Sequence, residues 1–224
     1  MILLFISLLL AYWFKYEITA FPIKTNQQSY NDIKMLYPLN LDINAFIKQS
    51  NLQPKKSSLN NLFFLTLPIA LFIFYSLSHP LLFILFILIY LAQLDYYYYL
   101  TDIKYIAIIF LLIIYHLLFE TSKDIYPHLF SFFIISLFFA VIIPLVNLIL
   151  KKSGLGLGDI LLFIALSPLF ELDQMLRLIL YASLLGLFFS GLYWLIKKQK
   201  IARLPFIPFI SASTFLLFID KIPP

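Results

Sequence analysis

The stretch that decides the fold is residues 81–95, which read LLFILFILIYLAQLD. It is apolar along nearly all of its length and closes on a carboxylate, Asp95. A helix needs about 20 predominantly apolar residues to cross a bilayer, and an ionisable group at membrane depth costs several kcal/mol. The stretch therefore predicts a membrane span with a functional carboxylate at its end.

The composition of the whole chain also indicates a membrane environment. Of its 224 residues, 62% are hydrophobic and 12% are charged, and the mean hydropathy is +0.96. Such a chain is too apolar for a soluble domain of this size. It has no cysteine, which excludes disulfides and cysteine-ligated zinc, and its three histidines are not at metal-ligand spacing. We expect an all-α, polytopic membrane helix bundle without a metal site.

Eight apolar segments are predicted to cross the bilayer. They are residues 1–14, 61–78, 80–94, 103–119, 127–150, 159–170, 174–196 and 205–219. The first segment lacks a preceding basic stretch and a small-residue cleavage site, which favours a retained anchor over a signal peptide.

This pattern divides the chain into three parts. Residues 1–14 form the first span, and 61–224 form the main membrane-embedded domain. Between them, residues 15–60 are rich in Asn, Gln, Lys and Ser. We expect them to be a small cytoplasmic loop region with one helix near 41–49.

The basic residues predict the orientation of the spans through the positive-inside rule. With 15–60 in the cytoplasm, 13 of the 16 basic residues lie inside, and only Lys123, Arg177 and Lys221 lie outside. Both termini then lie outside, and Asp95 and Asp159 lie at the cytoplasmic ends of their spans. The same rule explains the net charge of +5, so we expect no nucleic-acid partner.

The second aspartate, Asp159, ends the glycine-rich run GLGLG at residues 154–158. Taken alone it is typical of a helix cap, and the glycines are typical of a flexible loop or a close helix contact. Asp102 likewise fits an N-cap of the span that follows it. Two carboxylates on one membrane face, however, predict an aspartyl dyad, in which one activates water while the other holds a proton.

Three strings along the chain carry a resemblance to a known family. Residues 94–102 read LDYYYYLTD, 156–159 read GLGD, and 204–209 read LPFIPF. In this order on eight spans they resemble the type IV prepilin leader peptidases, which are membrane aspartic peptidases of the GxGD type. The resemblance covers residues 61–219, and the last string favours this branch over preflagellin peptidases and presenilin-like proteases.

The resemblance implies a role for each motif residue. Asp95 and Asp159 correspond to the catalytic pair, and Asp102 to an aspartate outside that pair. The residues that support the motifs are Gly156, Gly158, Pro205, Phe206 and Pro208. By this resemblance the chain is an endopeptidase of the bacterial inner membrane, with both termini in the periplasm. It would remove the leader from type IV prepilins or type II secretion pseudopilins at the cytoplasmic face.

The chain departs from the family pattern in four places, and the last of them bears on the second activity of these enzymes. Thr101 replaces a proline, Leu161 a lysine and Ile207 a glycine, and residues 15–60 lack the two Cys-x-x-Cys pairs of a zinc-binding domain. Many members also N-methylate the new terminus with S-adenosylmethionine. We expect a peptidase that requires no cofactor. S-adenosylmethionine would bind only if methyl transfer is retained, and we expect that activity to be weak or absent.

The alternative is a non-enzymatic membrane transporter or an assembly scaffold, because acidic residues in spans also mark ion pathways. A transporter predicts polar residues deep in the spans and paired broken helices. In this chain the acidic residues lie at the ends of the apolar segments, which favours the peptidase.

Overall fold

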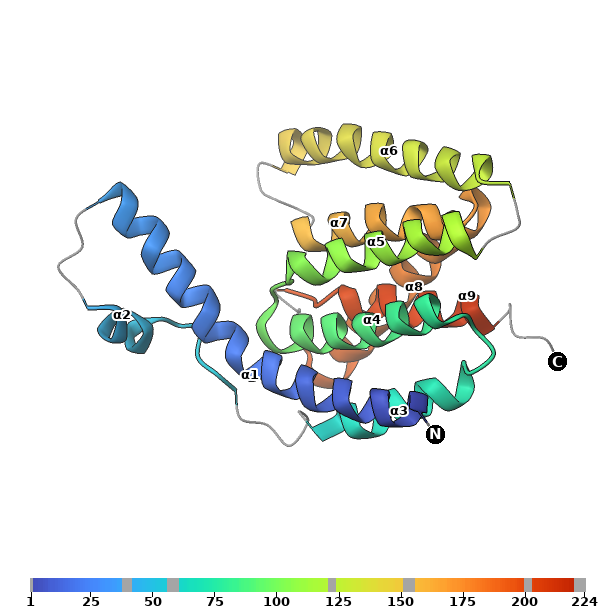
Figure 1. The fold of residues 1–224 in the computed structure, drawn as a ribbon. Coiled ribbons are helices and arrows are strands. Elements are labelled where there is room, and N and C mark those ends of the chain that lie inside the picture. The colour runs from blue at the N-terminus through green and yellow to red at the C-terminus, as the bar shows by residue number, and fades with distance from the viewer. Residues whose placement is uncertain are drawn as a thin grey trace. The chain divides into compact units, whose positions relative to one another are not determined.

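The computed structural model describes residues 2–37, 42–55, 61–120, 124–150, 156–199 and 203–219. All regular structure in these ranges is helical (Figure 1), so the predicted all-α fold class is confirmed. The chain forms two compact units, Met1–Phe72 and Ile73–Pro224. Gly154 of the glycine-rich run, and Lys123 and Lys221 of the predicted outside segments, fall outside the described residues.

The first unit consists of α1 (Ile2–Leu36), α2 (Ile43–Gln49) and most of α3 (Phe63–Ile73). Phe14 of α1 contacts Phe63 of α3, with ring centroids 5.8 Å apart. Asn26 of α1 is buried, and its amide donates to the Leu52 carbonyl at 2.8 Å and accepts from the Ser50 hydroxyl at 2.7 Å. These contacts fix the chain after α2 against α1.

The structure corrects the prediction that a loop begins at residue 15, because α1 continues to Leu36. Residues 15–36 become polar but contain no glycine, and Pro22 is their one proline. Some of their polar side chains are satisfied within the helix, as in the ion pair between Lys24 and Glu17 at 2.9 Å. A drop in hydropathy therefore marks the end of an apolar surface and not the end of a helix. The predicted helix near 41–49 is confirmed as α2, whereas a cytoplasmic location for 15–60 stays a prediction.

The second unit is a helical bundle. Its elements are α4 (His79–Tyr98), α5 (Ile103–Phe119), α6 (Tyr126–Leu150), α7 (Leu157–Leu166), the 3₁₀ helix η2 (Ser167–Leu169), α8 (Leu172–Lys197) and α9 (Ile207–Ile219). α4 is largely buried and packs against α5 and α9, while α9 packs also against α8, and α5 against α7. α6, yellow in Figure 1, lies at the edge of this unit beside α7 and α8.

Each of the eight predicted segments corresponds to a helix. Four of these helices, α1, α4, α6 and α8, are long and apolar enough to cross a membrane, whereas α3, α5, α7 with η2, and α9 are apolar but shorter. Large apolar side chains are exposed on the outer helices, among them Leu187 and Phe188 of α8, at 72% and 69%. Many large apolar side chains exposed on long apolar helices indicate a surface that faces lipid. The protein is a multi-pass membrane protein.

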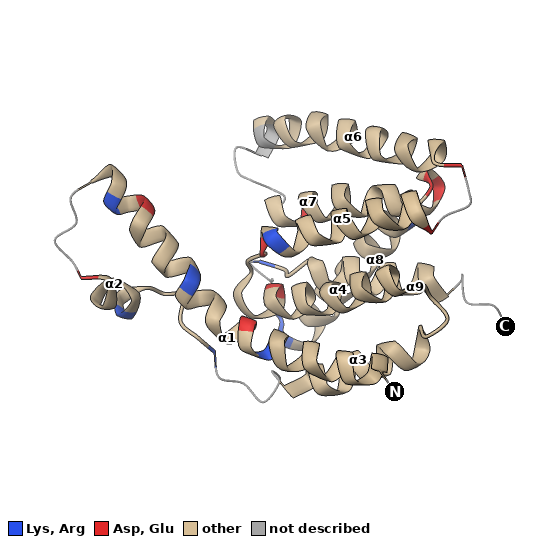
Figure 2. Cartoon of the chain, in the orientation of Figure 1, with Lys and Arg blue, Asp and Glu red and all other residues tan. Residues whose placement is uncertain are grey.

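The charged residues of the second unit lie near the ends of its helices, and the middle parts of the helices are free of charge in the described chain (Figure 2). This distribution matches a bundle whose mid-section lies in lipid, because charges in a hydrocarbon core are costly. It also makes the helix ends the places where carboxylates are available for chemistry.

Candidate active site

Asp95 lies in the last turn of α4 and is 6% exposed. The helix ends just beyond it at Tyr99, whose left-handed backbone (φ 53°) lets its N–H donate to the Asp95 carbonyl at 2.8 Å. A buried carboxylate requires a hydrogen-bonding partner. Asp95 finds it on another helix, because its Oδ2 accepts the backbone N–H of Ile207 at 3.0 Å.

Ile207 is the first residue of α9, so the string at 204–209 is the N-terminal boundary of that helix. The first amides of a helix have no partner within it. Pro208 lies in the first turn, where its missing N–H leaves no donor unsatisfied. The amides left at this boundary are those of Phe206 and Ile207, and both face the Asp95 carboxylate. Of the predicted support residues, Phe206 reaches Asp95 through its backbone amide, and Pro205 and Pro208 flank the two amides in the sequence.

Asp159 is the third residue of α7 and half-buried, and Gly156 is the N-cap of that helix. Its carboxylate interacts electrostatically with that of Asp95, so the two predicted members of the dyad lie near each other. The interpretation of Asp159 as the cap is wrong, because it lies in the first turn. Its charge there is favourable beside the positive end of the helix dipole.

Both described glycines of the GLGD string lie where a side chain would collide. A β-carbon at Gly158 would overlap the side chain of Thr101, and one at Gly156 would lie 2.7 Å from Oδ2 of Asp159. Thr101 belongs to the turn between α4 and α5. The bare backbone at Gly158 therefore lets this turn approach the start of α7, which draws the ends of α4 and α7 together.

Asp102 has a separate role. It is the N-cap of α5, and its Oδ1 accepts the backbone N–H of Lys104 at 3.1 Å. The prediction that Asp102 caps the following span is confirmed. Through this hydrogen bond the Asp102 side chain stabilises the first turn of α5.

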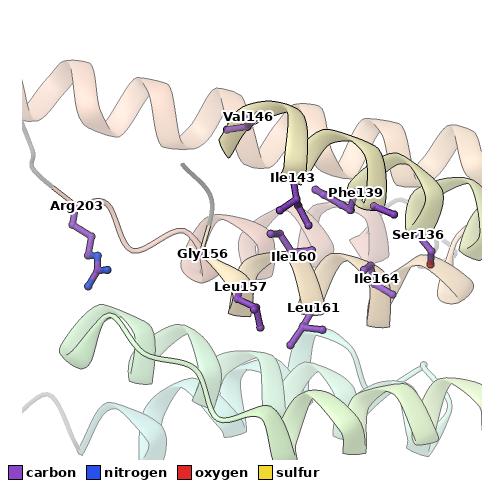
Figure 3. A pocket seen from close by; sticks show the side chains of 11 residues that line it. Ser136, Phe139, Ile143, Val146, Gly156, Leu157, Ile160, Leu161, Ile164 and Arg203 are labelled. Carbon is purple, nitrogen blue, oxygen red and sulfur yellow. The ribbon is translucent and has the colours of Figure 1, made fainter. Parts of the chain in front are cut away.

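A groove of about 600 Å³ opens between α6 and α7 (Figure 3). Its walls are almost wholly apolar, and one end is formed by Gly156 and the exposed guanidinium of Arg203. The larger apolar residues that line it are Phe139, Ile143, Val146, Leu157, Ile160, Leu161 and Ile164. The groove therefore runs along the helix that carries Asp159 and suits an apolar segment. Leu161, which replaces the lysine of the family pattern, is part of its wall.

Sequence reasoning missed two residues of this site. Arg203 lies near enough to act electrostatically on Asp95, yet in the sequence it is only one basic residue of a predicted cytoplasmic loop. Gly186 of α8 lies against the ring of Phe206. The signal that identifies Gly186 is its spacing of four from Ala182, the small-residue pattern of close membrane helix contacts.

The chemistry available to this arrangement is that of two neighbouring carboxylates beside an apolar groove. One carboxylate can accept a proton from water while the other donates one. In the described part of the chain, no cluster of three or more His, Asp or Glu side chains is arranged to hold a metal ion.

Comparison with known proteins links this site to one family. The sequence profile of the type IV leader peptidase family matches residues 82–191, which include both aspartates. The prepilin leader peptidase/N-methyltransferase of Haemophilus influenzae is 36% identical over 91 residues, which is 41% of this chain and 36% of that protein. The chain thus matches little more than a third of that relative's length. No solved structure matches the chain.

Proposed function

Because the chain belongs to the type IV leader peptidase family, we propose that it is a membrane aspartic endopeptidase with Asp95 and Asp159 as its dyad. The observation that carries the proposal is the meeting of the ends of α4, α7 and α9. It brings Asp95 near enough to Asp159 for the two carboxylates to influence each other electrostatically, and into a hydrogen bond with Ile207.

The dyad acts by general acid–base catalysis. The two carboxylates of such a dyad do not both ionise easily, so at working pH the pair holds one proton. The ionised member takes a proton from water as the water attacks the scissile carbonyl, and the protonated member donates to the carbonyl oxygen. The roles then reverse as the amine departs, and no covalent intermediate is needed.

The substrates are type IV prepilins or type II secretion pseudopilins, cut where a short basic leader meets an apolar segment. The groove between α6 and α7 supports this assignment, because its apolar walls suit an apolar helix and it begins beside the first turn of α7. The basic residues support cleavage at the cytoplasmic face of the bacterial inner membrane, with both termini in the periplasm.

We expect peptide cleavage with weak or absent N-methylation of the product. Cleavage needs the two carboxylates and water, whereas the methyl transfer of the family is associated with a cysteine-rich, metal-dependent domain. This chain has no cysteine with which to build such a domain.

Mass spectrometry of pilin processed by this protein alone tests both statements. A panel of tagged prepilins is co-expressed with the protein in cells that lack another leader peptidase, and the N-terminus of each pilin is identified. The proposal predicts cut, unmethylated pilin. A fully methylated terminus would show that the cysteine argument fails, and a panel left uncut would favour the transporter or scaffold.

A further inference from the structure

The two glycines of α8 have contrasting surroundings. No glycine in the described chain has a positive φ, so both Gly186 and Gly191 have a backbone that alanine also adopts. A β-carbon at Gly191 would meet nothing within 4 Å, whereas one at Gly186 would lie 3.1 Å from Cε2 of Phe206. Glycine is less favourable than alanine inside a helix. At Gly186, unlike Gly191, close packing explains the absence of a side chain.

Gly186 belongs to the inner face of α8. The buried residues of this helix are Met175, Leu178, Ala182 and Gly186, which recur at three- and four-residue intervals. Small residues four apart let a neighbouring segment approach the helix backbone. That segment is the chain before α9, since a β-carbon at Gly186 would also lie 3.5 Å from Cδ2 of Leu204.

Phe206 connects this face of α8 to the carboxylate of Asp95. Its ring lies against Gly186 and near the ring of Phe163 in α7, with centroids 6.3 Å apart. The next residue is Ile207, whose N–H donates to Asp95 Oδ2. Because the ring and the amide belong to adjacent residues, a displacement of the ring also moves the amide.

We infer that Gly186 is a positioning residue for Asp95. Because Gly186 has no side chain, the ring of Phe206 packs directly against α8. The packed ring in turn keeps the Ile207 amide in place at the Asp95 carboxylate. α8 thus takes part in the site without contributing a reacting group. The part of this inference that concerns cleavage rests on the proposed function, whereas the part that concerns the amide does not.

Hydrogen exchange measures the amide directly. Prolines have no N–H, so residues 205–208 contain only the amides of Phe206 and Ile207. We expect exchange in this segment to be faster in Gly186→Ala than in the wild type, and unchanged in Gly191→Ala, the matched control on the same helix. Asp95→Ala, which removes the acceptor, should accelerate exchange as well. Equal exchange in Gly186→Ala and the wild type would overturn the inference.

Cleavage of a tagged prepilin in the same membranes provides the second measurement. Gly186→Ala should slow cleavage on the order of tenfold or more, because small displacements of a catalytic group are costly. Adding Phe206→Leu, which is shorter than phenylalanine but still packs an apolar side chain against α8, should restore both cleavage and amide protection. Failure of this rescue, or an equal loss in Gly191→Ala, would assign the defect to α8 itself and overturn the inference.

The experiment is also informative if the wild type is inactive or if Gly186→Ala does not accumulate. If the wild type cuts no prepilin, the proposed function fails, and exchange at residues 205–208 still tests the positioning of the amide. If Gly186→Ala does not accumulate in the membrane, Phe206→Ala replaces it, since loss of the ring should release the same amides. If residues 205–208 exchange as slowly in Phe206→Ala as in the wild type, the inference is contradicted.

Discussion

Asp95 is buried at the end of α4, and its hydrogen-bond donor lies 112 residues further along the chain. Burial of a carboxylate is unfavourable unless it is hydrogen-bonded, and the first amides of a helix are unfavourable without an acceptor. The contact between Asp95 and Ile207 satisfies both groups at once. The string at 204–209 is thereby explained as a structural part of the site.

Gly158→Ala tests whether close approach at the start of α7 forms the site. The added β-carbon would overlap Thr101 and push the turn between α4 and α5 away from Asp159. We expect cleavage to fall by about 100-fold, because the two carboxylates no longer meet in working geometry. Combining it with Thr101→Gly, which removes the overlapping side chain, should recover much of the activity. Cleavage at the wild-type rate in Gly158→Ala would contradict this account.

The sequence predicted which carboxylates belong to the site better than it predicted the groups that bond to or pack against them. Asp95 and Asp159 were identified because carboxylates at the ends of apolar runs are costly, and Asp102 because an aspartate before a helix is typical of a cap. The Ile207 amide was not identified, because no local pattern marks a contact between residues so far apart. The spacing of Gly186 from Ala182 marks a close helix contact, but its role at the site depends on the distant ring of Phe206, which no local pattern shows.

The hydropathy of a segment and its tendency to form a helix are separate properties. The predicted helix near 41–49 and the eight apolar segments are present as helices. The end of α1 was wrong by some twenty residues, because residues 15–36 are polar yet retain helix-forming side chains. Apolar patterning identifies the surface that a helix buries or exposes to lipid, whereas breakers and caps determine where the helix ends.

Ile143→Trp tests the groove between α6 and α7 as the binding place of the substrate's apolar segment. The larger side chain would fill part of the cavity beside Ile160. We expect KM to rise on the order of tenfold with kcat little changed, the result of lost binding in both ground and transition states. Leu148→Trp is the matched control on α6, because Leu148 is 79% exposed and does not line the groove. An equal effect of both variants would show that the groove does not bind the substrate's apolar segment.

The junction between the start of α4 and the end of α5 should show a pH dependence. The Ser78 hydroxyl, hydrogen-bonded to the Glu120 carboxylate, lowers the pKa of that group from 4.5, and His116 adds to the effect. A lowered pKa in the folded state contributes stability at neutral pH that is lost as the pH falls through the titration of Glu120.

Ser78→Ala removes that hydrogen bond. We expect its melting temperature to lie below that of the wild type at pH 7, and the difference to shrink as the pH falls below 4.5. Ser76→Ala, a substitution at an exposed residue of the same turn, should show no such trend. A difference between Ser78→Ala and the wild type that is constant with pH would contradict this interpretation.

For the molecule as a whole, the sequence predicted best that the helices lie in a lipid membrane. A chain with 62% hydrophobic residues predicts a membrane protein, and the exposed Leu and Phe side chains of the outer helices agree with it. The packing partners of each helix were not predictable, because nearly every face of these segments is apolar. Which faces meet depends on small residues and helix ends, which hydropathy does not resolve.

The topology can be tested in this cysteine-free chain with single cysteines. The basic residues predict residues 15–60 and 197–203 inside and 120–126 outside. A membrane-impermeant thiol reagent should label Ser122→Cys in intact cells, and should label Asn51→Cys and Gln199→Cys only after permeabilisation. The reverse pattern would invert the orientation and move both aspartates to the opposite face.

Single amide substitutions test whether Asp95 and Asp159 act together as the catalytic pair. Cleavage of a tagged prepilin is measured for Asp95→Asn, Asp159→Asn and Asp102→Asn, with the amount of each protein in the membrane as the control. We predict that the first two variants abolish cleavage while remaining in the membrane, because neither carboxylate can perform both proton transfers alone. Asp102→Asn should retain most of the activity, because asparagine also caps a helix. Near-normal cleavage by Asp95→Asn or Asp159→Asn, with loss in Asp102→Asn, would contradict the assignment.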